Sequence, residues 1–68
     1  MNEDSKKLGE NLKKFRIQKN ITQTEIANTL GVDRSFVSNI ENGKTNPTLS
    51  TIASLAKSLD ITINELLK

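Results

Sequence analysis

The chain has nothing that could cross-link it, and this limits what it can fold into. Its 68 residues include no cysteine and no histidine, so neither a disulfide framework nor a His/Cys metal site can hold it together. A domain this small must then rely on closely packed, well-capped helices, on a second copy of itself, or on both. We therefore expect a single domain over residues 1–68, without a metal or a cofactor.

Apolar residues recur at helical spacing, and no segment alternates as a strand would. The pattern predicts a first helix from about Ser5 to about Lys19, in which Gly9 lowers the helix propensity. Capping-box sequences at Thr22–Glu25 and Thr62–Glu65 predict the starts of a second and a fifth helix. The sequence thus predicts an all-α fold of five short helices.

Turn and capping residues separate the middle helices. Gly31 is expected to end the second helix, because a positive φ favours glycine. Asp33 is expected to cap the third helix and Gly43 to end it. Thr48 can cap a fourth helix, whose apolar residues are Leu49, Ile52, Ala53, Leu55, Ala56 and Leu59.

The segment from about 23 to 42 meets the requirements of a helix-turn-helix. Ala27 lets two helices approach closely, and Gly31 makes the turn between them. Apolar residues are available to fill the space between the helices: Ile26, Leu30, Val32, Val37 and Ile40. In such a motif the second helix can enter the major groove of DNA.

The stretch "TQTEIANTLGVDRSFVSNIENGKTNPTLSTIASLAKSLDITINELL" resembles the Cro/CI-type (XRE) DNA-binding domain of phage repressors and restriction–modification controller proteins. The resemblance covers about residues 8–67. It is carried by Thr-Gln at the second helix start, by "IENG" at the end of the third helix and by Pro-Thr-Leu before the fourth. It implies a compact, lambda-repressor-like five-helix domain. Asp60 stands where the family usually has glycine, and aspartate tolerates the left-handed conformation better than most residues.

The resemblance implies that the third helix, at about 34–42, reads DNA bases. Arg34 is the first candidate, because its planar fork matches O6 and N7 of guanine. Ser35, Ser38 and Asn39 are the other base-reading candidates. Phe36 either packs beside the fourth helix or contacts thymine methyl groups, and the sequence does not decide between the two.

Other residues are expected to contact the DNA backbone or to hold the fold. Free amides at the start of the second helix favour a phosphate near Gln23. By resemblance Gln23, Asn42 and Lys44 contact phosphates, whereas Arg16 and Glu41 form an internal ion pair. The apolar side chains of the last helix, expected to be shared between the monomer core and a dimer interface, are Ile63, Leu66 and Leu67.

These features predict a cytoplasmic, nucleoid-associated homodimer that binds a near-palindromic operator on double-stranded DNA. By resemblance it regulates its own operon, as a phage-type repressor or a restriction–modification controller. RNA polymerase would be a partner if the protein activates, and the sequence gives neither the operator nor the sign of regulation. No small-molecule ligand is expected, and no apolar run reaches the roughly 20 residues of a membrane helix.

Two other classes of function compete with this one. An enzyme is not expected, because enzymes usually recruit histidine or an activated nucleophile and this chain has no histidine or cysteine. Ser54-Leu-Ala-Lys57 matches the S-x-x-K pattern but lacks its companion motifs. An antitoxin or adaptor-like protein-interaction module on the same fold is the stronger alternative, because fold alone does not fix function. The net charge of +2 favours nucleic acid only weakly, although six basic residues fall within the first twenty: Lys6, Lys7, Lys13, Lys14, Arg16 and Lys19.

Overall fold

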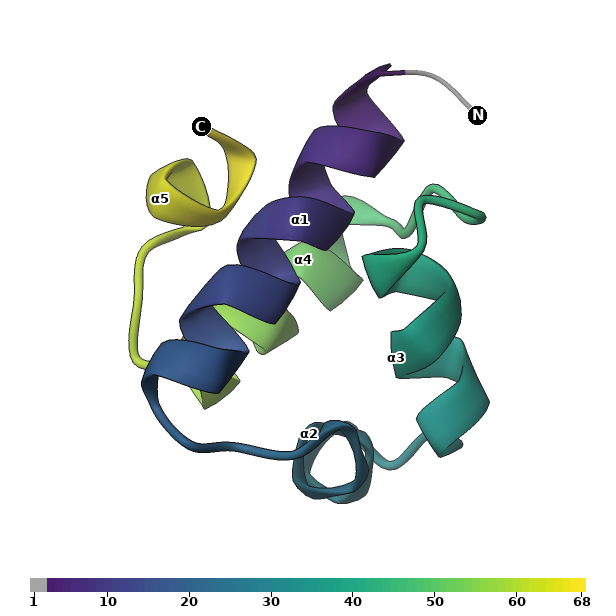
Figure 1. Cartoon of the computed structure of the whole chain (residues 1–68), viewed down its shortest axis with the longest axis vertical. Helices are drawn as coiled ribbons and strands as arrows, with labels where there is room; N and C mark the ends of the chain where they lie inside the picture. The colour runs from purple at the N-terminus through teal and green to yellow at the C-terminus, as the bar shows by residue number, and fades with distance from the viewer. Residues whose placement is uncertain (1–2) are drawn as a thin grey trace.

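The computed structural model describes residues 3–68, and all of the regular structure within them is helical (Figure 1). In chain order they are α1 (Glu3–Gln18), α2 (Gln23–Leu30), α3 (Arg34–Glu41), α4 (Leu49–Ser58) and α5 (Ile63–Leu67). No strand occurs within this part of the chain. The predicted all-α fold of five short helices is confirmed.

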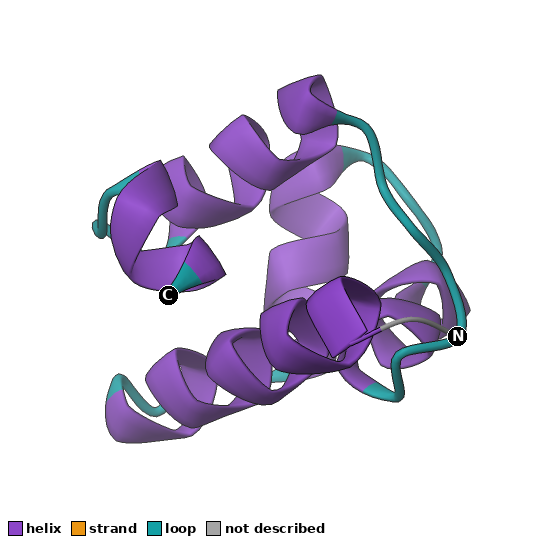
Figure 2. Cartoon of the chain, turned by 90° about the horizontal axis from the view of Figure 1, so that it is seen from above, coloured by secondary structure: helices purple, strands orange, loops and turns teal. Residues whose placement is uncertain are grey.

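The helices surround one apolar core. In Figure 1, α1 crosses in front of α4, with α3 on one side and α5 on the other, and α2 is seen end-on below them. α1 packs against α3 and α5, while α2 packs against α3 and α4. Figure 2 shows the same helices from above, arranged around the interior that the core side chains fill. These side chains are Leu8, Leu12, Ile26, Ala27, Val37, Ile40, Ile52, Leu55, Ala56, Leu59 and Leu66.

Both capping boxes form as the sequence predicts. The Oγ1 of Thr22 accepts from the Glu25 amide at 3.0 Å, and the Glu25 carboxylate accepts from the Thr22 amide at 2.9 Å. Thr62 and Glu65 repeat this reciprocal pair at the start of α5. Thr48 caps α4 by accepting from a backbone amide at 3.2 Å. Each cap satisfies amides that have no partner within their own helix.

The expected cap of α3 is only half correct. Asp33 occupies the N-cap position with an extended backbone, but its side chain makes no capping hydrogen bond. The amide that a cap would receive, that of Phe36, donates instead to the Asp33 carbonyl at 3.0 Å. The turn before α3 therefore depends on Gly31, whose φ of +73° closes α2 in the left-handed region.

Gly9 is required for the close approach of α1 to α3. A Cβ on Gly9 would lie 2.3 Å from the carbonyl oxygen of Ile40 and 2.6 Å from that of Glu41. Both are backbone atoms at the end of α3, so a larger residue would push the two helices apart. The sequence pattern showed Gly9 only as a weak helix former, whereas its lack of a side chain sets the position of α3.

The expected place of Leu66 at a dimer interface is wrong. Leu66, expected to be shared with a dimer interface, is 0% exposed and belongs to the monomer core. The Nδ2 of Asn11 donates to the Leu66 carbonyl at 2.9 Å and ties α5 to α1. Leu49, an apolar residue in the first turn of α4, is 67% exposed. Asp60, by contrast, adopts the expected left-handed conformation, with φ of +56°.

Candidate nucleic-acid interface

The polar candidates of α3 lie on the side of the helix that the core leaves open. Arg34, Ser35 and Asn39 are exposed and Ser38 is half-buried. On the opposite side of α3, Val37 and its core neighbour Ile40 are 0% exposed. Residues three and four apart share a helix face, so the polar candidates form one continuous edge.

An ion pair joins α1 to the end of α3. The Nε of Arg16 lies 2.6 Å from Oε2 of Glu41, and its Nη2 donates to Oε1 of the same carboxylate at 3.2 Å. The two side chains are only 14% and 3% exposed. Nη1 of Arg16 donates to the Ile21 carbonyl at 2.9 Å, so the guanidinium also holds the loop before α2. The pair implied by the family resemblance is present.

Gln23 extends this ion pair to the first residue of α3. Its Nε2 donates to Oε1 of Glu41 at 3.0 Å, and its Oε1 accepts from Nη1 of Arg34 at 2.9 Å. Arg16, Glu41, Gln23 and Arg34 thus form a chain of hydrogen bonds across α1, α2 and α3. The role of Gln23 in this hydrogen-bond network could not be predicted from the sequence, because its partners Glu41 and Arg34 lie 18 and 11 residues away.

Of three further candidates, one lies within α3 and two lie in the segment after it. Asn42 and Lys44 are exposed in the segment that follows the helix, and the Lys44 amide donates to the Asn39 carbonyl at 2.9 Å. Phe36 is half-buried and packs against the core. Its packing role is therefore observed, and a contact with thymine methyl groups remains a prediction for the part of the ring that is not covered.

No three His, Cys, Asp or Glu side chains within the described part of the chain are grouped so that they could hold a metal ion. None of the helices in residues 3–68 combines the length and hydropathy needed to cross a membrane. The polar edge of α3, with Arg34, Ser35 and Asn39 exposed, is the candidate binding surface.

Comparison with known proteins identifies the family. The helix-turn-helix family model HTH_3 matches residues 12–66. The chain is 40% identical over 63 residues to the ImmF control region 10 kDa protein of Bacillus phage phi105. The matched stretch covers 93% of this chain and 70% of that protein.

Solved structures of restriction–modification controller proteins share the fold. C.AhdI from Aeromonas hydrophila has a TM-score of 0.89 and 38% identity, over 96% of this chain and 98% of that one. C.Esp1396I, solved as a tetramer in complex with its natural 35 base-pair operator, has a TM-score of 0.83 and 28% identity, over the whole of both chains. The chain described here therefore belongs to the helix-turn-helix (XRE-type) family, whose members are DNA-binding transcriptional regulators and not enzymes.

Proposed function

We propose that this regulator binds a near-palindromic operator as a homodimer, with α3 of each protomer in the major groove. The observation that carries the proposal is the division of α3 into two sides, one with Val37 and Ile40 fully buried and the other polar and open. Such a helix is anchored by its apolar side while its polar edge stays accessible to base edges. The operator-bound controller protein of the same fold supports this arrangement.

Arg34 is proposed as the main base-reading residue. It lies at the first position of α3, and the carbonyl of the Gln23 side chain accepts one of its N–H groups. Because a guanidinium has five N–H donors, the others remain available for O6 and N7 of a guanine. The contact with Gln23 restricts the rotamers of Arg34 before DNA arrives. Ser35, Ser38 and Asn39 would read or contact neighbouring positions along the same edge.

Phosphate contacts are proposed after the end of α3 and at the start of α2. Asn42 and Lys44 are exposed after the helix, where they can meet one strand. At the start of α2, both ends of the Gln23 side chain are engaged within the protein. The phosphate there would accordingly meet the backbone amides of Gln23 and Thr24, which have no partner inside the helix and are not taken by the Thr22 cap. Such contacts set the register of the protein on DNA and do not read sequence.

Dimerisation is assigned to the remaining apolar surface of α5. Leu67 is 46% exposed and Ile63 is half-buried, whereas Leu66 is taken up by the monomer core. A two-fold dimer through this helix would present two copies of α3, and one helical turn of DNA requires them to be about 34 Å apart.

Control of its own operon is the regulatory role we propose, as a phage-type repressor or a restriction–modification controller acting on the nucleoid in the cytoplasm. The support is the similarity to phage control and restriction–modification controller proteins. RNA polymerase would be an additional partner if the bound dimer activates transcription.

A footprint on the DNA upstream of the protein's own gene tests the proposal. We expect a protected site made of two half-sites related by a two-fold axis. The affinity should fall steeply as salt rises, because lysines and arginines that bind phosphates release the counterions condensed on the DNA. Weak binding to every sequence with a flat salt dependence would contradict DNA recognition. It would favour the alternative, an antitoxin or adaptor that binds a protein.

A further inference from the structure

The N-terminal part of α1 lies against the segment that carries two of the proposed phosphate contacts. A Cβ added to Gly43, which stands between Asn42 and Lys44, would lie 3.2 Å from the Cα of Lys6. The Oγ of Ser5, a residue that is 2% exposed, donates to Oδ1 of Asn46 at 3.2 Å across 41 residues of sequence. The close approach at Gly43 and the Ser5–Asn46 hydrogen bond place the backbone of Lys6 beside the segment after α3.

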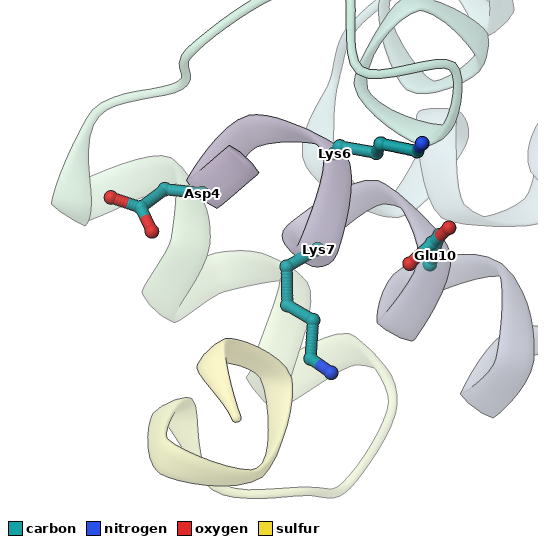
Figure 3. A pocket seen from close by; sticks show the side chains of 4 residues that line it. All are labelled: Asp4, Lys6, Lys7 and Glu10. Atoms are coloured by element: carbon teal, nitrogen blue, oxygen red, sulfur yellow. The ribbon is translucent and has the colours of Figure 1, made fainter. Parts of the chain in front are cut away.

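The lysines of α1 do not share one side of the helix. Lys6 and Lys7 are consecutive, so their side chains leave the helix about 100° apart. Figure 3 shows them diverging, Lys6 toward the segment at the end of α3 and Lys7 toward the side where α5 is drawn. Lys14 lies seven residues after Lys7 and thus on the same side, with its Nζ 4.8 Å from the centroid of the Phe15 ring. Lys6 is therefore distinguished from Lys7 and Lys14 by its place next to α3.

The Lys6 ammonium is available to an anion from outside the protein. Lys6 is exposed. Asp4 and Glu10 line the same shallow surface depression as Lys6 and Lys7 (Figure 3). Among the side chains of residues 4–68, however, the pair of Arg16 and Glu41 is the only ion pair within 4.0 Å. An exposed ammonium that has no carboxylate partner among residues 4–68 suits a phosphate, which lysine binds as a point charge.

We infer that Lys6 contacts a DNA phosphate and extends the interface from the segment after α3 onto α1. The inference rests on the proposed function and adds to it a residue far from the helix-turn-helix in sequence. The contact would strengthen binding to every sequence and read no base. Lys7, on the other side of α1, would stay out of contact and serves as the matched control.

Salt dependence tests the inference. Lys6→Gln and Lys7→Gln each remove one charge and keep much of the side-chain stem. Binding of each to a random-sequence duplex of about 30 base pairs, three helical turns, is measured at several salt concentrations. One phosphate contact contributes about 0.9 to the slope of log affinity against log salt, so a dimer with two copies of Lys6→Gln should lose about 1.8. The factor by which the affinity of Lys6→Gln falls short of the wild-type affinity should shrink about 12-fold between about 50 and about 200 mM salt.

Lys7→Gln should leave the slope unchanged, and Lys6→Arg should restore it. Equal slopes for wild type and Lys6→Gln, or equal reductions in the Lys6 and Lys7 variants, would overturn the inference and leave the proposed function standing. A wild-type protein that fails to bind the duplex even at low salt would overturn both.

A second measurement uses only the wild-type protein, so it does not depend on whether a variant folds. The amines of the wild-type protein are acetylated with and without the duplex, and the modified lysines are quantified by mass spectrometry. DNA should slow the labelling of Lys6 relative to Lys7. If DNA slows the labelling of Lys6 and Lys7 by the same factor, or slows neither, the inference is overturned.

Discussion

Glu41 is predicted to hold more of the fold together than its position near the end of α3 suggests. Its carboxylate is 3% exposed and accepts three hydrogen bonds, two from Arg16 and one from Gln23. In Glu41→Ala the Arg16 guanidinium keeps only its bond to the Ile21 carbonyl and stays largely buried. Breaking one side of a buried ion pair costs about 3–5 kcal/mol. Because Arg16 remains 14% exposed to water, we place the loss at the lower end, about 3 kcal/mol.

The loss should be visible in ordinary unfolding experiments. A domain of this size has a total stability of about 3–10 kcal/mol, so Glu41→Ala should be marginally stable. Each kcal/mol shifts Tm by about 4–8 °C in a domain of this size, so a shift of about 12–24 °C is expected by circular dichroism.

The double variant Arg16→Met/Glu41→Met controls for the stranded charge, because it removes both partners and should cost less than Glu41→Ala alone. A loss below about 1 kcal/mol in Glu41→Ala would show that the pair behaves like an exposed one and would refute the reasoning. A double variant at least as destabilised as the single one would refute it as well.

Three further changes test separate parts of the structure. Gly9→Ala should destabilise the protein by at least about 1–3 kcal/mol in urea unfolding, because the new Cβ meets backbone atoms of α3; a gain of about 1 kcal/mol, as helix propensity alone predicts, would contradict this. The Thr62 amide and hydroxyl, which donate to Glu65, hold the pKa of that carboxyl below its ordinary value of 4.5. Its stabilising contribution is thus present at neutral pH and lost as pH falls through the lowered pKa, so the stability advantage of wild type over Glu65→Gln should shrink with acid; an advantage that is constant with pH would argue against the contact. Leu66→Ala should cost about 2–5 kcal/mol of monomer stability, whereas Leu67→Ala should mainly weaken dimerisation in sedimentation experiments; the reverse pattern would place α5 differently.

Local features of this fold could be read from the sequence because the interacting groups are neighbours in the chain. The capping boxes at Thr22 and Thr62 join residues three apart, and the left-handed turns at Gly31 and Asp60 depend on the residue at that position. The helix starts and stops were therefore predicted within a few residues. Asp33 is the exception, because the Phe36 amide donates to the Asp33 backbone carbonyl and not to its side chain.

Contacts between distant helices could not be read in the same way. The need for glycine at position 9 exists only because the end of α3 lies against it. Leu66 and Leu67 are chemically alike and adjacent, and only the docking of α5 on α1 decides which one is buried.

The site shows the same division between local pattern and distant contact. The polar edge of α3 follows from its helical spacing, and the partnership of Arg16 with Glu41 was available only through family resemblance. The bridging role of Gln23 requires three helices to be in place, so no spacing in the sequence could have indicated it.

The central claim is that the open edge of α3 reads bases, and the affinity ratio between the operator and a random duplex measures this most directly. The ratio is to be determined for wild type, Arg34→Ala and Lys44→Ala. We predict that Arg34→Ala lowers the ratio by a factor that corresponds to about 1–3 kcal/mol of binding free energy. Lys44→Ala should weaken binding to both duplexes alike and leave the ratio unchanged. An Arg34→Ala variant that loses the same affinity for both duplexes would contradict the claim.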